Sequence, residues 1–209
     1  MKRTMVAILL AAVSLLVVLW IGLDKKPAEP TDMNDPDDEI INSGENFIVT
    51  ELNDGKATKY QYTVADKNGN ILEQAICAEE PRVVQKSEKL LGIRFSFSGS
   101  NIYRYYDLEN GAISPTFKNA FWDNGTLVAY YEHKDGLNFT VQPIFGEGHV
   151  ATVKADTNFW HVSVRSAVLS PDNTSLDISY VSGDEDSASA IEYHVSVPIT
   201  VMPELNGGY

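Results

Sequence analysis

Tight-turn dipeptides recur through the chain after residue 47 and separate short runs of β-prone residues. Asn or Asp followed by Gly tolerates the positive φ angles that two-residue hairpin turns require. A proline fixes its own φ angle and favours a turn of another type. These signals stand at Asn68-Gly69, Asn110-Gly111, Asn124-Gly125, Asp135-Gly136 and Ser170-Pro171-Asp172-Asn173. Turns this frequent predict a succession of hairpins.

The runs between the turns alternate apolar and polar residues with a period of two. Tyr60, Tyr62 and Val64 share one face, while Gln61 lies on the other. The same pattern is carried by Ile93, Phe95 and Phe97, by Leu137, Phe139 and Val141, by Leu176, Ile178 and Tyr180, and by Ile191, Tyr193, Val195 and Val197. Such alternation is typical of strands with one apolar and one wetter face. No window after residue 47 shows a clear helical period, so residues 47–209 are predicted to form an all-β domain, an antiparallel meander of blade-like hairpins.

Two architectures fit these hairpins. Three stretches each carry three strands, and their middle strands begin near Leu91, Leu127 and Leu176. Those spacings bracket the ~40 to 50 residues of a propeller blade. One-sided alternation favours instead a sandwich or open barrel with solvated faces. Residues 47–209 are also short for four full blades, the usual minimum, so the choice between a small or incomplete propeller and a sandwich stays open.

One hairpin resembles a known repeat. The segment LSPDNTSLDISYVSG, residues 169–183, is similar to the Ser-Pro-Asp-Gly-x-x-Leu strand pair of exported bacterial β-propeller-type repeat proteins. It departs from that pattern at Asn173, where the repeats carry Gly. The chain as a whole also resembles small uncharacterised exported bacterial proteins. The resemblance implies blade-like sheets and a location outside the cytoplasm.

The N-terminal segment is apolar on every side. Residues 5–23, MVAILLAAVSLLVVLWIGL, carry no charge and follow Lys2 and Arg3. A helix of this length reaches about 28 Å, close to the ~30 Å thickness of the bilayer hydrocarbon. Residues 1–23 are therefore predicted to be a signal-anchor transmembrane helix that holds the β domain outside the cytoplasm at the cell membrane. The alternative is a signal peptide and secretion after cleavage, although no Ala-x-Ala-like site follows the apolar run.

Residues 24–46 separate this segment from the β domain. They contain eight acidic residues, three prolines and few apolar side chains. Such a segment buries too little apolar surface to offset its ordering entropy. It is predicted to be an acidic disordered linker.

Charge and cysteine content exclude some roles. The formal net charge of −13 argues against nucleic acid as a partner, because counterion release needs clustered Lys and Arg. A single cysteine, Cys77, permits no intrachain disulfide. It stands in an apolar run and is expected to be a small buried side chain rather than a reactive thiol.

No cofactor, metal site or catalytic residue is expected from the motifs. Gly146 to Ala151 fit a dinucleotide-binding pattern, but the segment that follows is β-like rather than helical. His133, His149, His161 and His194 are far apart in different strands or turns, a spacing that predicts no metal site.

Aromatic residues concentrate in the middle of the β domain. Trp122 and the pair Trp160-His161 flank turns, where an exposed ring can stack on a sugar or hold a protein. They are the predicted binding residues of an interaction module at the bacterial cell surface, with a glycan or an envelope protein as partner. The alternatives are a glycan-directed hydrolase that uses carboxylates from distant strands and a structural subunit of an envelope complex.

Overall fold

The computed structural model describes residues 39–53, 57–97, 100–146, 148, 150–155, 161–182 and 191–199. The hydrophobic helix predicted over residues 1–23 and most of the linker lie outside the described residues. Every regular element of the described part is a β-strand. The strands are β1 (Glu39–Ser43), β2 (Phe47–Asn53), β3 (Thr58–Ala65), β4 (Ile71–Cys77), β5 (Arg82–Gln85), β6 (Leu90–Phe97), β7 (Ser100–Asp107), β8 (Phe117–Lys118), β9 (Ala120–Asp123), β10 (Leu127–His133), β11 (Leu137–Pro143), β12 (Ala151–Lys154), β13 (Val162–Leu169), β14 (Ser175–Ser182) and β15 (Ile191–Pro198).

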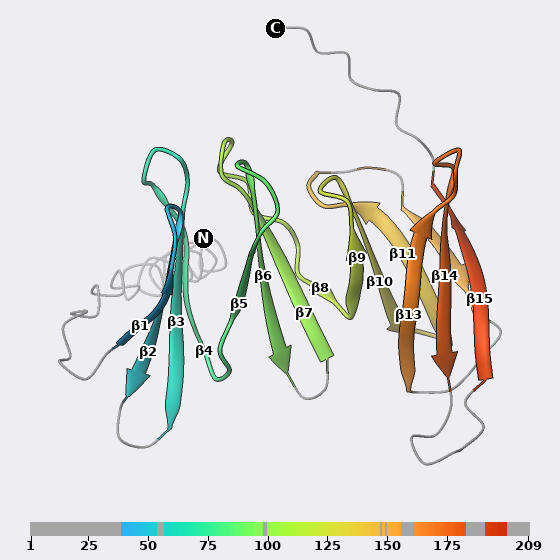
Figure 1. Ribbon diagram of the computed structural model, residues 1–209, viewed down its shortest axis with the longest axis horizontal. Coiled ribbons are helices and arrows are strands. Elements are labelled where there is room, and N and C mark those ends of the chain that lie inside the picture. Colours follow the sequence, from blue (N-terminus) through green and yellow to red (C-terminus); the bar gives the residue numbers. More distant parts are fainter. Residues whose placement is uncertain are drawn as a thin grey trace, which may run out of the picture. The chain divides into compact units, whose positions relative to one another are not determined.

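The strands form four sheets in chain order (Figure 1). Sheet A has the order β1-β2-β3-β4, sheet B β5-β6-β7-β8, sheet C β12-β11-β10-β9 and sheet D β13-β14-β15. All pairings between neighbouring strands are antiparallel. The predicted all-β fold of antiparallel hairpins is confirmed for the part of the chain that the structure describes.

The predicted turn residues connect the strands as their chemistry requires. Asp135 and Gly136 take positive φ angles of 55° and 120° between β10 and β11. Asn173 takes a φ of 57° in the turn between β13 and β14. Asn adopts this left-handed conformation more readily than most other non-glycine residues. That tolerance explains why the hairpin forms although it carries Asn where the similar repeats carry Gly.

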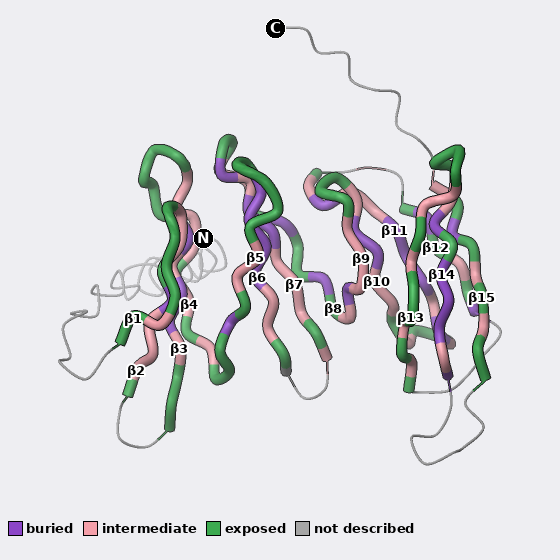
Figure 2. Tube along the Cα trace, viewed as in Figure 1, coloured by how far each residue is buried: buried purple, intermediate pink, exposed green. Residues whose placement is uncertain are grey.

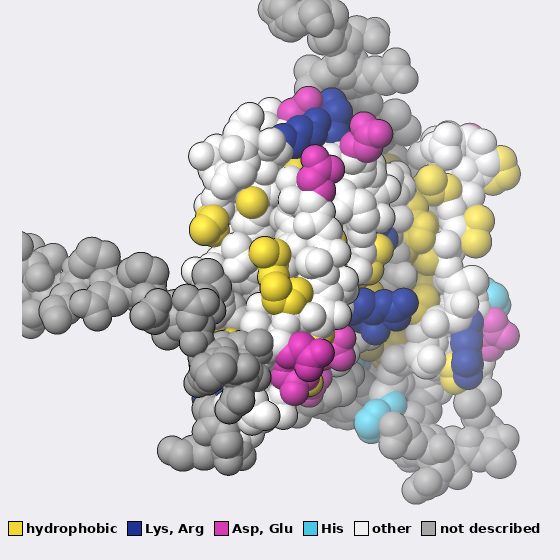
Figure 3. Space-filling view, turned by 60° about the vertical axis from the view of Figure 1, so that its left-hand side comes forward, with side chains coloured by type: hydrophobic (Ala, Val, Ile, Leu, Met, Phe, Trp, Pro, Cys, Tyr) yellow, Lys and Arg dark blue, Asp and Glu magenta, His cyan; other side chains and the backbone are white. Residues whose placement is uncertain are grey.

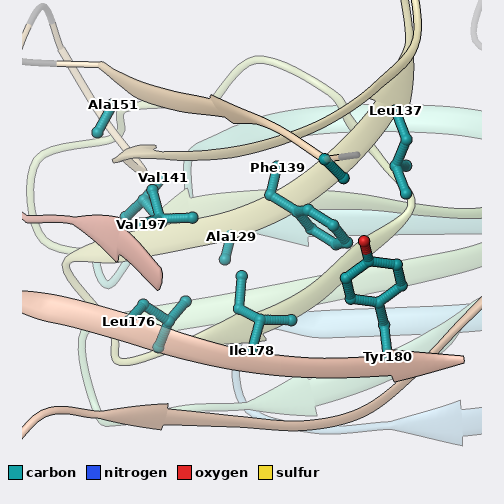
Figure 4. Packing of buried hydrophobic residues seen from close by; sticks show 10 residues of the cluster. Ala129, Leu137, Phe139, Val141, Ala151, Leu176, Ile178, Tyr180 and Val197 are labelled. Carbon is teal, nitrogen blue, oxygen red and sulfur yellow. The ribbon is translucent and has the colours of Figure 1, made fainter. Parts of the chain in front are cut away.

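Three apolar cores join the sheets. The A/B core contains Val49, Tyr62 and Val64 of sheet A with Leu91, Ile93 and Tyr106 of sheet B. The B/C core contains Leu90, Tyr105 and Phe117 of sheet B with Ala120 and Val128 of sheet C. The C/D core joins Ala129, Leu137, Phe139 and Val141 of sheet C to Leu176, Ile178, Tyr180 and Val197 of sheet D (Figure 4). The sheets therefore stack face to face in chain order, and Figure 2 shows buried segments along strands of each sheet.

Sheets B and C are packed on both faces, which differs from the predicted solvated face. On β10, Val128 enters the B/C core while its neighbour Ala129 enters the C/D core. On β7, Tyr105 enters the B/C core while Tyr106 enters the A/B core. The alternation is hard to read in such strands because tyrosine has an apolar ring that is buried and a polar tip that finds a hydrogen-bond partner.

The β domain begins earlier than the sequence predicts. Residues 39–43, assigned to the acidic linker, form β1 and pair with β2. Ile41 packs against the A/B core, and this burial offsets the ordering of a short strand whose other residues are largely exposed. The prediction of a disordered linker up to residue 46 is wrong for these residues, and residues 24–38 lie outside the described part.

Cys77 ends β4 with a partly buried side chain. Its Sγ donates a hydrogen bond to the carbonyl oxygen of Tyr60 over 3.5 Å, and burial raises the pKa of the thiol. A raised pKa disfavours the reactive thiolate. The geometry agrees with the predicted packing role.

Candidate functional site

A hollow of about 270 Å³ lies between sheets B and C. Gly92, in the middle of β6, pairs with Val84 on one side and Tyr105 on the other, and it leaves room for the ring of Tyr105 beside it. A Cβ at residue 92 would lie 3.4 Å from the ring carbons of Tyr105. The hollow is lined from sheet B and its loops by Val84, Lys86, Tyr103 and Tyr105, and from sheet C by Ala120, Phe121, Trp122 and Asp123.

Asp123 is the polar centre of this hollow. Its side chain is 9% exposed, and its Oδ2 lies 2.8 Å from Nζ of Lys86. The hydroxyl of Tyr105 donates a hydrogen bond to the same oxygen over 3.1 Å. Burial, followed by the charge of Asp123, raises the pKa of Tyr105, so its hydroxyl stays protonated and remains a donor. A cation and a phenol from sheet B thus hold a carboxylate from sheet C.

A second hollow of about 380 Å³ adjoins the first, and Lys86 lines both. Its walls are the loops that precede β6, follow β7 and precede β10. Nζ of Lys89 lies 2.6 Å from Oε2 of Glu109 there, and this carboxylate raises the pKa of Lys89. We call the two hollows together the B/C cleft. The second hollow is lined by Lys86, Ser87, Lys89, Leu90, Asp107, Glu109, Asn124, Gly125, Thr126 and Phe145.

The B/C cleft combines apolar rings with charged donors and acceptors. An ammonium group has three donors and a carboxylate has about four acceptor positions, so the Lys86–Asp123 pair keeps hydrogen-bonding capacity for a ligand. Rings at the edge of such a pair offer a flat apolar surface. Small-molecule sites are typically hollows of ~300 to 1,000 Å³ with a few polar groups among apolar walls. The arrangement therefore suits a neutral polyhydroxylated ligand with both polar edges and apolar faces.

Trp122 is one of the predicted binding residues, and it lines the B/C cleft from β9. The residue is partly buried and also packs against the C/D core. It pairs with Ala129, which belongs to that core, so β9 presents Trp122 on the side of sheet D and Asp123 on the side of sheet B. Trp122 is thus placed at the cleft, but part of its surface is used in packing.

Of the second predicted pair, the structure describes only His161. Trp160 lies outside the described residues. His161 precedes β13 with an exposed side chain, and its carbonyl oxygen accepts a hydrogen bond of 3.4 Å from Ser182 Oγ. It is not among the residues that line the B/C cleft.

Sequence reasoning missed the polar residues of the cleft. Asp123 directly precedes the Asn124-Gly125 turn, and Lys86 stands in a short loop. Charged residues beside turns are ordinarily solvated, so neither position stands out in the sequence. Their partnership depends on the stacking of sheets B and C.

The described residues hold neither a candidate metal centre nor a membrane-spanning helix. They contain no group of three or more His, Cys, Asp or Glu side chains placed to hold a metal ion. They also contain no helix that is long and apolar enough to span a membrane.

Comparisons with known proteins identify no relative. No protein-family model, curated protein or solved structure matches this chain.

Proposed function

We propose that the β domain is an extracytoplasmic binding module at the bacterial cell surface and that its ligand is a glycan held in the B/C cleft. The observation that carries the proposal is the Lys86–Asp123 ion pair, whose Asp123 side chain is only 9% exposed, in a hollow that Tyr103, Phe121 and Trp122 also line. Sugars present apolar C–H faces and hydroxyl edges, which match aromatic rings and charged hydrogen-bonding groups.

The remaining parts of the proposal rest on the sequence. The apolar run of residues 5–23 supports a membrane anchor, with secretion after cleavage as the alternative. The resemblance of residues 169–183 to exported propeller-type repeats supports a blade-like arrangement of the four sheets. The acidic charge supports a partner other than nucleic acid.

The experiment is a calorimetric titration of the full-length protein in mild detergent with soluble cell-wall fragments and oligosaccharides. Binding to one glycan class is expected, and Tyr103→Ala or Trp122→Ala is expected to weaken it at least about tenfold, as loss of a central aromatic contact does. Tyr60→Ala is the matched control, because Tyr60 lies on β3 of sheet A away from the cleft. Circular dichroism establishes that each variant is folded.

Three outcomes contradict the proposal: no binding to any fragment, equal loss in the control, or unchanged binding in both cleft variants. Trp160→Ala, a separate arm, tests the second aromatic position that the sequence predicts. Release of reducing sugar from a bound fragment would favour the hydrolase alternative, for which Asp123, Asp107 and Glu109 are the carboxylates of the cleft.

A further inference from the structure

Within the part of the chain that the structure describes, no second sheet packs on the outer face of sheet A, whereas sheet B packs on its inner face. Ile40, Thr50, Gln61 and Ile76 pair across all four strands and share a face. That face is opposite the one where Val49 and Tyr62 enter the A/B core. Ile40, Ile48 and Ile76 are 62%, 44% and 58% exposed there.

This outer face is also uncharged across its middle. Besides the three isoleucines, its two central rows hold only Ser, Thr and Gln side chains, namely Ser43, Thr50, Gln61, Thr63 and Gln74. Figure 3 shows hydrophobic side chains among uncharged surface on the side that comes forward, with charged side chains above and below. The body as a whole is strongly acidic. Exposed isoleucines without charged neighbours in these rows match the depletion of charge that marks the cores of protein interfaces.

The outer face of sheet D has a complementary form. Ser166, Ser179 and His194 pair across its three strands, on the side opposite Tyr180 and the C/D core. Small serines leave a hollow of about 630 Å³ on this face, and Val168 at its margin is 60% exposed. Asp177 and Glu192 also line the hollow. The outer face of sheet A carries an opposite charge. Lys59 pairs there with Leu52 and lies on the same face as Gln61, so its ammonium complements the carboxylates of sheet D.

The outer faces of sheets A and D are the two end faces of the stack of four sheets. Sheet A packs on sheet B, B on C and C on D, each time through apolar side chains of facing sheets. The same face-to-face packing continues between two molecules if the isoleucine-bearing outer face of sheet A of one copy lies on the hollowed outer face of sheet D of the other. We propose that this chain associates head to tail, with the outer face of sheet A of one copy seated on the outer face of sheet D of a second copy.

The area agrees with a contact of this kind. Sheet D is the smaller of the two faces, with three strands. Three strands about 4.8 Å apart and about 23 Å long cover roughly 330 Å², so one joint buries roughly 660 Å² in total, in the range of weak contacts. Such a heterologous contact uses two different surfaces of the chain, unlike a two-fold dimer.

Sedimentation of the full-length protein in mild detergent tests the association. We expect a protein mass of at least two copies, and at least about tenfold weaker association for Ile48→Lys and for Ile76→Lys, because each places a charge in the contact. The matched control is Ile113→Lys, an exposed isoleucine that lies outside the strands of sheets A and D. A wild-type monomer, or equal association of wild type and both variants, overturns the proposal.

Crosslinking distinguishes head-to-tail contact from any other self-association. In a Cys77→Ser background, chains carrying Ile48→Cys are mixed with chains carrying Val168→Cys and treated with a bifunctional maleimide. We expect the mixed pair to crosslink at least about tenfold faster than either variant alone, because only a heterologous joint brings the two faces together. Equal crosslinking in all three samples, or none in the mixture, overturns the proposal even if a lysine variant fails to fold.

Discussion

The hydroxyl of Tyr106 on β7 donates a hydrogen bond to Oε2 of Glu73 on β4 over 2.6 Å, and this contact joins sheet B to sheet A. Tyr106 is fully buried. The other carboxylate oxygen of Glu73 accepts a hydrogen bond from Arg104, which is also on β7. A polar cluster therefore sits beside the A/B core, much as the Lys86–Asp123 pair sits beside the B/C core.

Tyr106→Phe removes one donor from this cluster without changing the packed ring. Because the acceptor is a carboxylate, we expect a loss of about 1.5 to 3 kcal/mol in the free energy of unfolding. Urea denaturation followed by circular dichroism measures it. Tyr193→Phe is the control, since that ring stacks on Tyr180 outside the cluster, and a change within about 0.5 kcal/mol is expected there. Equal stability of the two variants would contradict the role given to the Tyr106 hydroxyl.

The free energy of unfolding should fall as the pH rises above about 10. Burial, and then the neighbouring carboxylates, raise the pKa of Tyr105 and Tyr106 above the ordinary value of 10.0. The folded state therefore keeps protons that the unfolded chain releases above pH 10, so the stabilisation is complete below that pH and is lost as pH rises. Each tyrosine contributes up to about 1.4 kcal/mol per pH unit.

The measurement is the urea midpoint from about pH 9 to 11.5, where this loss begins. The double variant Tyr105→Phe/Tyr106→Phe should show a shallower decline than wild type. Parallel pH profiles for the two proteins would contradict the prediction.

Phe139 holds sheets C and D together. Its ring centroid lies 4.8 Å from that of Tyr180 across the C/D core, and the residue is fully buried. Phe139→Ala should lower the free energy of unfolding by about 3 to 5 kcal/mol because it removes the ring and leaves a cavity. Phe139→Leu should lower it clearly less. Thermal unfolding of both variants checks this order, and a similar cost for both would place the ring outside the core.

The turn before β14 should hold an unusually acidic carboxyl. Hydrogen bonds from Ser170, and then from Thr174, lower the pKa of Asp172 from 3.8 to about 2. The contribution of these hydrogen bonds to stability is therefore present above pH 3.8 and is lost as pH falls through about 2. Carboxyl carbon NMR of full-length protein measures the titration. Ser170→Ala should move the pKa of Asp172 back toward 3.8, and Ser170→Thr should leave it low. A pKa near 3.8 for Asp172 in the wild-type protein would contradict the geometry.

Local structure could be predicted from the sequence because its causes are local. Positive φ angles at Asp135 and Asn173 follow from the residue types, and the alternation of Leu176, Ile178 and Tyr180 follows from the pleat of β14. β1 was missed because a short strand among acidic residues has no such pattern, and only its pairing with β2 and the burial of Ile41 stabilise it.

The candidate site depends on long-range contacts and could be predicted only in part. Trp122 was selected from its type and its place beside a turn, and it does line the cleft. Asp123 and Lys86 were not selected because their pairing is decided by the stacking of two sheets. Glu73 and Arg104 come together for the same reason across sheets A and B.

The most direct test of a glycan site in the B/C cleft is chemical-shift mapping of the isotope-labelled full-length protein with the best glycan of the panel. Our account predicts that the largest changes fall on Lys86, Tyr103, Trp122 and Asp123, with smaller ones around Lys89 and Glu109. Changes that centre on the outer face of sheet A or sheet D, or no change with any glycan, would contradict it.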